Sequence, residues 1–297
     1  MNIKQAFTLI ELLVVIAIIG ILSGMIVVAM GSTTDKAAIA KAQVFSNSLR
    51  NSLMANIVAQ YTFDDITDYN SSTKILNSTV GNVPDSWANN EGQAYNGPTF
   101  KEGNDCVSGS CLFFDGVDDY VNVNSVDDFN LSKTGQLTVG LWFKTSVINA
   151  TAIIQKGSEW MFYPITGNTV GFLVRGTTTW RYSSTFTNLK TNKWYYVVGV
   201  ANYVGTNLNM NFYVDAKAYG ETDVNTDIGT TTNALTIGST WTNRFNGFID
   251  DVRIYNTILP TSQIKEQYYA GLNNLLINGQ ISKREYLERI NSLASNE

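Results

Sequence analysis

The chain has 297 residues and a formal net charge of −5, with 20 basic and 25 acidic side chains. It therefore lacks the basic footprint of a nucleic-acid-binding protein, and 12% aromatic with only 15% charged residues excludes an intrinsically disordered chain. There is no histidine, which removes the commonest general base and the commonest zinc ligand.

A short leader, residues 1–6 with Lys4, precedes an apolar run over 7–30. As a helix this run would be about 36 Å long, which is enough to cross a bilayer. The run contains a single charged residue, Glu11, and a carboxylate at membrane depth costs about 2.5–3.5 kcal/mol. The sequence predicts a transmembrane helix over 7–30, in which Glu11 needs a compensating partner.

The stretch FTLIELLVVIAIIGIL resembles the N-terminus of type IV pilins and pseudopilins. The resemblance implies that prepilin peptidase cleaves between Ala6 and Phe7 and methylates the new amino terminus. It also implies that the Glu11 carboxylate pairs with the Phe7 ammonium of a neighbouring subunit, because two charges that are each costly in an apolar medium become tolerable together. Ala6 stands where this family usually has Gly.

Residues 31–58 continue with helical periodicity. Apolar side chains recur at steps of three and four and form one stripe; they are Ala38, Ala42, Phe45, Leu49 and Leu53. We expect an amphipathic continuation of the helix whose stripe packs on the globular part.

Residues 59–257 alternate between apolar and polar positions with a period of two, in short segments separated by Gly, Asn, Asp, Thr and Ser. This pattern predicts a mainly β domain, an antiparallel sandwich of two sheets. The segments are AQYTFD, SCLFFDG, DYVNVN, LTVGLWFK, AIIQKG, TVGFLVRG, TWRYSSTF, KWYYVVGVANY, LNMNFYVDA, ALTIGS and GFIDDVRIY.

Several blocks of this domain resemble the laminin-G-like, or concanavalin A-like, jellyroll family. They are YTFDD, LFFDGVDDYVNV, LTVGLWFK, NKWYYVVGV, NFYVDAKAYG, LTIGS and FNGFIDDVRIYNTILPTSQI. The resemblance implies a jellyroll that binds ligands. Trp142 and Trp194 alternate with apolar neighbours in their strands and are expected in the core.

The two cysteines, Cys106 and Cys111, lie in CVSGSC. The spacing is wrong for a thioredoxin-type motif, and a zinc site would need further Cys or His. We expect a local disulfide and an oxidising compartment, with two reduced cysteines as the alternative.

Many members of the jellyroll family bind Ca²⁺, and three aspartates lie in matching blocks: Asp64, Asp118 and Asp250. They are the candidate ligands of a structural Ca²⁺ ion, which takes six to eight oxygen ligands. The alternative is that they cap loops without a metal. Because strand side chains alternate, one of Asp250 and Asp251 must point towards the interior.

Catalysis is not expected. A glycosidase of this fold needs facing carboxylates, and none of the head's glutamates lies in an alternating acidic motif; they are Glu91, Glu102, Glu159 and Glu221. Without histidine there is no Ser-His-Asp arrangement either.

Carbohydrate or protein binding is the more serious possibility. Aromatic and guanidinium side chains suited to sugars lie in the middle and late parts of the head: Trp160, Arg175, Trp180, Tyr182, Trp241 and Arg244. Trp180 and Tyr182 share one strand face. The alternative is that these residues cover the sandwich or meet a neighbouring subunit.

Residues 258–297 are expected to be helical. One helix starts after Pro260 and stops at Asn278, and a second has Ser282 as its cap with Glu285 three residues later, a capping box. Their apolar positions could pack on the head or on another subunit.

The sequence thus predicts a bacterial pilin-like or pseudopilin-like subunit. It would be anchored in the cytoplasmic membrane with its head outside and, after assembly with other subunits, would form part of a surface pilus or pseudopilus. A glycan or surface protein would be its ligand. The alternative is an uncleaved membrane-anchored surface lectin that does not polymerise.

Overall fold

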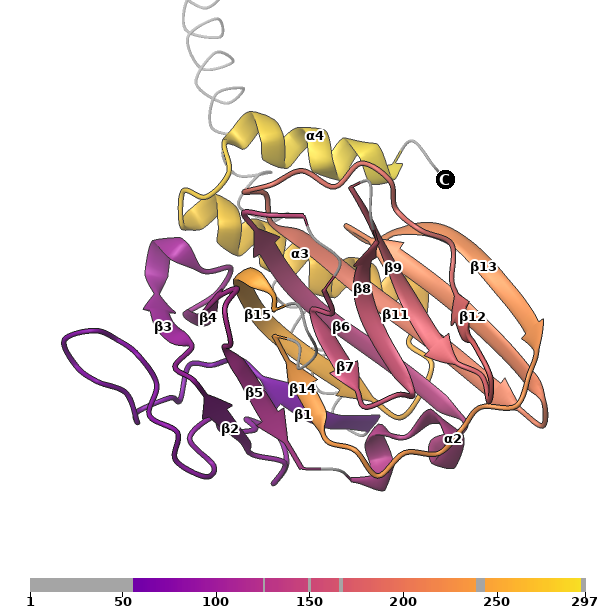
Figure 1. The fold of residues 1–297 in the computed structure, drawn as a ribbon. Coiled ribbons are helices and arrows are strands. Elements are labelled where there is room, and N and C mark those ends of the chain that lie inside the picture. Colours follow the sequence, from indigo (N-terminus) through magenta and orange to yellow (C-terminus); the bar gives the residue numbers. More distant parts are fainter. Residues whose placement is uncertain (1–55, 125, 149–150, 166–167, 239–243, 295–297) are drawn as a thin grey trace, which may run out of the picture. The chain divides into compact units, whose positions relative to one another are not determined.

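The computed structural model describes residues 56–124, 126–148, 151–165, 168–238 and 244–294. Within them the chain forms two antiparallel sheets, shown in Figure 1. The eight-stranded sheet, called the large sheet below, contains β1 (Ile57–Tyr61), β3 (Thr99–Glu102), β4 (Ser110–Asp115), β6 (Gln136–Thr145), β11 (Tyr195–Val204), β12 (Asn207–Val214), β13 (Lys217–Asn225) and β15 (Asn246–Tyr255).

The seven-stranded sheet, called the small sheet, contains β2 (Gly92–Tyr95), β5 (Tyr120–Val123), β7 (Ile154–Lys156), β8 (Trp160–Ile165), β9 (Thr169–Arg175), β10 (Trp180–Tyr182) and β14 (Leu235–Ile237). Its strand order is β10-β9-β8-β7-β14-β5-β2, and that of the large sheet is β13-β12-β11-β6-β15-β4-β3 with β1 paired to β15. Short helical turns are η2 (Gly103–Asp105), η3 (Asp127–Phe129) and α2 (Leu131–Thr134). The predicted antiparallel sandwich is confirmed.

The structure also has strands that the sequence pattern did not reveal: β2, β3, β8 and β13. The first two are only four residues long, β8 contains Pro164, and β13 is a polar edge strand with mostly exposed side chains. None of them shows the long apolar alternation that marks a half-buried strand.

The predicted membrane helix, 7–30, and most of the predicted amphipathic helix lie outside the described residues. The end of the latter was predicted wrongly, because Ile57 and Val58 already belong to β1, where Ile57 pairs with Tyr255 of β15. Both residues are β-branched and favour strands. Among the described residues, no helix has the length and apolar character needed to cross a membrane.

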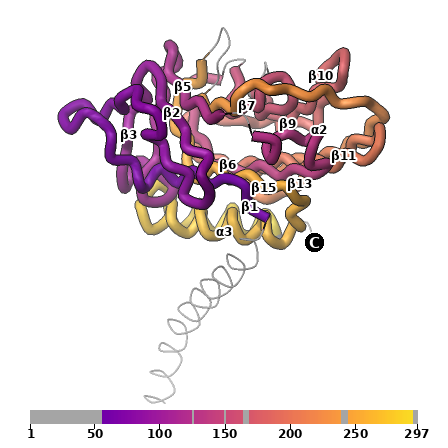
Figure 2. Tube along the Cα trace, turned by 90° about the horizontal axis from the view of Figure 1, so that it is seen from below, coloured from indigo at the N-terminus to yellow at the C-terminus, as the bar shows by residue number. Residues whose placement is uncertain are grey.

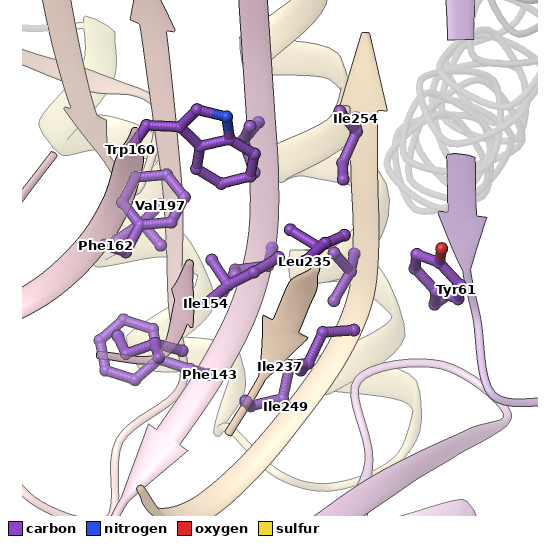
Figure 3. Close-up of a cluster of buried hydrophobic side chains, with 14 of the residues drawn as sticks. Tyr61, Phe143, Ile154, Trp160, Phe162, Val197, Leu235, Ile237, Ile249 and Ile254 are labelled. Atoms are coloured by element: carbon purple, nitrogen blue, oxygen red, sulfur yellow. The ribbon is translucent and has the colours of Figure 1, made fainter. Parts of the chain in front are cut away.

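The inner core fills the space between the sheets. Phe143 of β6, Val197 of β11 and Ile249 of β15 meet Ile154, Phe162 and Leu235 of the small sheet there (Figure 3), and all six are fully buried. Because strand side chains alternate between faces, one face of each sheet supplies this core.

Strand β15 changes partners along its length. Its first half pairs with β4 and its second half with β1, while β6 lies along its other side. A bulge separates the halves: the register with β6 shifts between Asp250 and Arg253, and Asp251 has φ +52°. The Asp251 carboxylate accepts a 2.8 Å hydrogen bond from Arg253.

An outer core lies on the opposite face of the large sheet. It is covered by α3 (Thr261–Ile277) and α4 (Lys283–Ala294), and Figure 2 shows α3 running along this face. Trp142 and Trp194 are buried here, as predicted. Trp142 stacks on Tyr268 of α3 with ring centroids 5.7 Å apart. The C-terminal helices therefore pack on the head, which decides between the two partners considered from the sequence.

The approach of α3 to the sheet is close. A Cβ atom on Gly271 would lie 2.5 Å from the Trp142 ring, so only glycine fits at this helix position. On the same helix Gln267 accepts a hydrogen bond from the Tyr196 hydroxyl at 2.8 Å and donates one to the Tyr255 hydroxyl at 3.2 Å.

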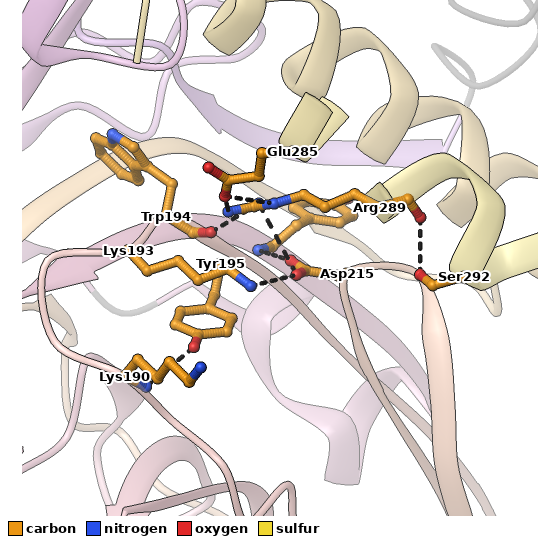
Figure 4. A network of polar contacts seen from close by, with 9 residues as sticks. Lys190, Lys193, Trp194, Tyr195, Asp215, Glu285, Arg289 and Ser292 are labelled. Carbon is orange, nitrogen blue, oxygen red and sulfur yellow. Dashed lines mark hydrogen bonds and ion pairs between the residues drawn. The ribbon is translucent and has the colours of Figure 1, made fainter. Parts of the chain in front are cut away.

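Helix α4 is held by a polar network, drawn in Figure 4. Arg289 donates to the Trp194 carbonyl at 3.0 Å and to Glu285 at 2.7 Å, and lies 3.9 Å from Asp215. The predicted cap is confirmed, since the Ser282 hydroxyl accepts the Glu285 N–H at 3.1 Å. The Glu285 carboxylate, however, binds Arg289.

Candidate functional site

An aromatic and cationic patch lies at one edge of the small sheet, on the face turned away from the inner core. In the pairing of β9 with β10, Trp180 lies opposite Arg175 and Tyr182 opposite Leu173, so their side chains share a face. The Arg175 guanidinium lies 5.7 Å from the Trp180 ring centroid. Tyr182 is 50% exposed. We call Arg175, Trp180 and Tyr182 the edge patch.

A small apolar cluster supports the edge patch. Ala152, Met161 and Leu173 are buried together on this face, and Tyr163 and Trp180 pack against them. Met161 lies opposite Leu173 in the pairing of β8 with β9. The cluster holds the Trp180 ring against the sheet while Tyr182 stays accessible.

The turn between β9 and β10 sets the position of Trp180. The Gly176 N–H donates to the Thr179 carbonyl at 2.9 Å and closes the turn. A Cβ atom on Gly176 would lie 2.5 Å from the Thr226 hydroxyl, so a larger residue would push this turn away. The sequence offers Gly here and thereby places Trp180 directly across from Arg175.

Chemically, the edge patch combines a flat π surface, a phenol and a guanidinium. Aromatic rings offer large, rigid contact area, and Tyr adds a hydroxyl that can donate and accept. Arg adds a planar fork of five N–H donors. These groups suit a ligand with both apolar C–H surface and oxygen acceptors, as sugars have.

Three of the predicted ligand residues therefore come together, namely Arg175, Trp180 and Tyr182. Trp160 does not join them: it is fully buried in the inner core, where its indole N–H donates to the Phe129 carbonyl at 2.8 Å. The expectation that Trp160 contacts a ligand is contradicted, because its ring faces the sheet interior. Trp241 lies outside the described residues.

Arg244 belongs to a second arrangement at the opposite end of the small sheet. Its guanidinium lies 5.0 Å from the centroid of the Tyr120 ring, and Tyr120 stacks on Tyr95 at 4.9 Å. The Tyr95 hydroxyl donates to Gln93 at 2.9 Å. Sequence reasoning missed both tyrosines, because β2 was not predicted and the pairing that joins them was therefore invisible.

The predicted disulfide is confirmed, with Cys106 and Cys111 joined at 2.02 Å. Two of the predicted calcium ligands hold the loop that it closes. The Asp250 carboxylate accepts the N–H groups of Val107 at 2.9 Å and Ser108 at 3.1 Å. Asp64 accepts the N–H of Ser110 at 2.7 Å.

Asp250 is the buried member of the Asp250–Asp251 pair, with 1% of its surface exposed. It lies opposite Trp142 of β6 and therefore faces the outer core, beneath the disulfide loop, and not the inner core. Burial raises its pKa well above the ordinary carboxyl value, and the nearby charges of Asp251 and Asp64 raise it further. The two loop N–H groups act against this rise. Asp64 and Asp250 thus act as loop-capping carboxylates.

Asp118 lies in a different group, with Asp115 and Asp119. One carboxylate oxygen from each lies within 4.8 Å of the others, and we call these three residues the acidic turn. Burial raises the pKa of Asp119 to about 6, and the charges of its two neighbours add to this rise. The predicted ligands do not form one set, and calcium binding stays a prediction.

Comparison with known families places these features in context. The family model of the concanavalin A-like lectin/glucanases superfamily, in its laminin-G-like form, matches residues 115–265, about half of the chain. The chain belongs to this superfamily. Residues 1–27 of this lectin-superfamily protein match the prokaryotic N-terminal methylation motif, which is characteristic of type IV pilin-like subunits.

Solved structures share the fold. The binding domain of botulinum neurotoxin serotype D superposes with a TM-score of 0.53 at 14% identity, covering 74% of this chain and 53% of that chain. The botulinum neurotoxin DC binding domain in complex with rat synaptotagmin II gives a TM-score of 0.51 at 18% identity, with 74% and 52% covered. This lectin-superfamily chain thus spans about half the length of the toxin domains.

Domain 4 of AbnA, an extracellular arabinanase from Geobacillus stearothermophilus, was solved in complex with arabinotriose. It has a TM-score of 0.51 at 17% identity and covers 71% of this chain and 97% of its own. At these identities the likeness shows the fold alone. The comparison with curated proteins gave no match.

Proposed function

We propose that the protein is a type IV pilin-like subunit that displays a non-catalytic binding head. The observation that carries this proposal is that one chain combines a match to the N-terminal methylation motif with a domain of the lectin superfamily. The first feature supports anchoring and assembly, and the second supports ligand binding.

In this proposal prepilin peptidase cuts between Ala6 and Phe7, and the mature chain stays in the cytoplasmic membrane with its head outside. Assembly with other pilin or pseudopilin subunits then carries the head to the cell surface. Glu11 pairs with the Phe7 ammonium of the next subunit, which removes the cost of two isolated charges in an apolar medium. These residues lie outside the described structure.

The edge patch is our candidate for the ligand face, and a carbohydrate is the ligand class that its chemistry favours. Three of the predicted ligand residues lie together there, with Tyr182 half exposed and the Arg175 guanidinium 5.7 Å from the centroid of the Trp180 ring. The relatives of known structure include one solved with arabinotriose and one with a protein, synaptotagmin II. A surface protein is therefore the second ligand class.

The absence of catalysis is also part of the proposal. Among the described glutamates, Glu159 is buried and accepts the Ser132 N–H, and Glu102 pairs with Lys74 at 3.5 Å. Glycoside hydrolysis requires two carboxylates that face each other across a cleft, whereas each of these two glutamates is engaged in a local structural contact.

Intact mass and peptide mapping of the protein from native membranes test the anchoring half. A chain that begins with methylated Phe7 supports processing. A chain that still begins with Met1 would instead favour the uncleaved membrane-anchored lectin, an alternative prompted by Ala6 at the cleavage position. We expect Glu11→Ala to insert into the membrane and fail to assemble, and normal filaments from this variant would contradict the charge-pairing argument.

A glycan array that includes arabinan oligosaccharides tests the binding half. We expect Trp180→Ala and Tyr182→Ala to lose signal relative to the unaltered protein, whereas Arg244→Ala, at the other end of the small sheet, keeps it. Loss of signal only in Arg244→Ala would place the ligand at the Tyr95–Tyr120 stack, and equal signal in all variants would remove both faces from consideration.

A further inference from the structure

The loop closed by the disulfide, residues 106–111, connects parts of the chain that lie far apart in sequence. On one side it is fixed to the sandwich: Asp250 of β15 accepts two of its N–H groups, and Asp64, beyond the end of β1, accepts a third. A Cβ atom on Gly109 would lie 2.0 Å from the Asp64 carboxylate, so the loop sits directly on that side chain.

On its other side the loop meets the end of α3. The Asn278 amide, at the C-terminal end of α3, donates to the carbonyls of Cys106 at 3.4 Å and Val107 at 3.3 Å. Val107 is fully buried in the outer core, the same cluster that contains Leu275 of α3. The loop thus supplies both polar and apolar contacts to the helix end.

Lys144 of β6 joins the same two parts. Its ammonium donates to the Asp105 carbonyl at 3.4 Å, just before the loop, and to the Gln280 side chain at 3.3 Å, in the turn between α3 and α4. It also lies 4.3 Å from the Phe248 ring centroid. The turn of the C-terminal hairpin, α3 with α4, is therefore docked on the disulfide loop and its flank.

The conformation of the loop matters for Asp250, because the loop supplies the N–H groups that hydrogen-bond to its carboxylate. Asp250 is buried beside Asp64 and Asp251, which carry like charge, and its Oδ1 atom has no hydrogen-bond partner among the described residues. The loop amides are the donors that it has. A buried carboxylate that loses its donors is strongly disfavoured, so a loosened loop would open this part of the fold.

Both partners lie outside the region that matches the lectin superfamily, residues 115–265. The disulfide loop precedes that region and Asn278 follows it. The contact between them is therefore a feature of this chain that the matched family region does not contain.

We propose that the Cys106–Cys111 bond is required for stable docking of the C-terminal hairpin. The end of α3 and helix α4 dock stably on the large sheet only after the two thiols have been oxidised. Completion of the head then follows export from the reducing compartment, since disulfides form and persist in oxidising surroundings. Until that step the outer core lacks part of its cover.

The oxidation is a thiol–disulfide exchange with an oxidant that itself contains a disulfide. One cysteine thiolate attacks the oxidant's disulfide and forms a mixed disulfide, and the second cysteine displaces the oxidant as a dithiol, so two electrons and two protons leave the chain. Both cysteines are fully buried in the docked structure. Exchange therefore precedes docking, and docking then shields the bond from reductants.

Limited trypsin digestion of the detergent-solubilised full chain tests the proposal. Lys283 and Arg284, at the start of α4, become cleavable when the hairpin undocks, because a protease cuts locally opened segments. Lys133, exposed in α2 and away from the hairpin, reports on the sandwich. We expect the Cys106→Ser/Cys111→Ser variant to be cut at α4 about tenfold faster than the oxidised protein, with cutting at Lys133 unchanged.

Asn278→Ala is a second test variant, which removes the contact between α3 and the loop but leaves the disulfide intact. The mass of the variant protein under non-reducing conditions will verify that the bond has formed. We expect a smaller acceleration at α4 for this variant. Unchanged cleavage at α4 in both variants would overturn the proposal. Equal acceleration at Lys133 and α4 would also overturn it, because the bond would then support the whole sandwich and not the hairpin in particular.

Discussion

Replacing Arg289 with methionine is expected to destabilise the head by about 3 kcal/mol. Arg289 is 7% exposed and holds α4 on the large sheet through the Trp194 carbonyl, Glu285 and Asp215. Methionine reaches about as far as the arginine Nε atom and so keeps the apolar contacts of the stem without the guanidinium. The change therefore removes the polar anchor and leaves the packing of the helix largely in place.

The size of the stability loss follows from the interactions that remain to Asp215 and Glu285 once Arg289 is removed. Removing one member of a buried ion pair costs about 3–5 kcal/mol. Asp215 is 20% exposed and keeps Lys193 at 4.0 Å and the Tyr196 N–H at 3.1 Å, and Glu285 is 39% exposed and can turn to water. These remaining interactions place the expected loss at the lower end, about 3 kcal/mol.

The loss should depend on pH. Burial raises the pKa of Asp215, and Arg289 and Lys193 oppose that rise. Without Arg289 the pKa of Asp215 in the folded protein moves further above its unfolded value. The cost of the ionised carboxylate is then present above the folded pKa and disappears as the pH falls below the unfolded pKa. The variant should come closer to the unaltered protein at acidic pH.

Thermal unfolding followed by near-ultraviolet circular dichroism measures the effect. For a domain of this size, about 3 kcal/mol corresponds to a fall in Tm of about 6–12 °C. Arg284→Met is the matched control on the same helix, since Arg284 is 87% exposed and, within the part of the chain that the structure describes, pairs with exposed Glu288 at 3.5 Å. The reasoning is refuted if the two variants differ by less than about 1 kcal/mol, the range of an exposed ion pair.

Three further predictions concern other parts of the head. Burial raises the pKa of Glu159, so its ionisation lowers the stability of the fold as the pH rises above the unfolded carboxyl pKa. Glu159→Gln should reduce this loss of stability, measured as the difference in urea-unfolding free energy between pH 4.5 and 7. Parallel pH profiles for the variant and the unaltered protein would contradict the prediction. Gly271→Ala should lower stability by about 1–3 kcal/mol, because its Cβ would lie 2.5 Å from the Trp142 ring, and an unchanged Tm would mean that α3 shifts freely. If the acidic turn binds calcium, a tenfold excess of Ca²⁺ over its Kd should raise the Tm of the EDTA-treated protein by about 3–6 °C, and a constant Tm would count against the site.

The sandwich could be predicted because its central strands carry strong alternation. In β15 the segment FIDDVRIY indicated buried Ile249 and Ile254 and one aspartate near the interior. The structure buries Asp250, but on the outer face of the sheet beneath the disulfide loop. Polar or very short strands gave no such signal. Strand β13 has no continuous apolar face, because it forms the edge of the large sheet.

The candidate site was only partly predictable for a related reason. Period two correctly placed Trp180 and Tyr182 on one face, which is a local property of one strand. Whether Trp160 faces inwards depends on the start of β8, which was not predicted, and the contact of Arg244 with Tyr120 depends on the packing of a loop against β5. Such long-range arrangements leave no trace in local periodicity.

The change of partners along β15 has a mechanical consequence. A head tethered through residues before β1 receives any pull at Ile57, whose strand pairs with the second half of β15. From there the load passes across β15 to β6, which binds β15 on both sides of the bulge at Asp251. The C-terminal hairpin follows β15 in the chain and is not in series with this route. Under the proposed function, tension between the anchor and a ligand at the edge patch would therefore be carried by the backbone hydrogen bonds of the large sheet and by the inner core.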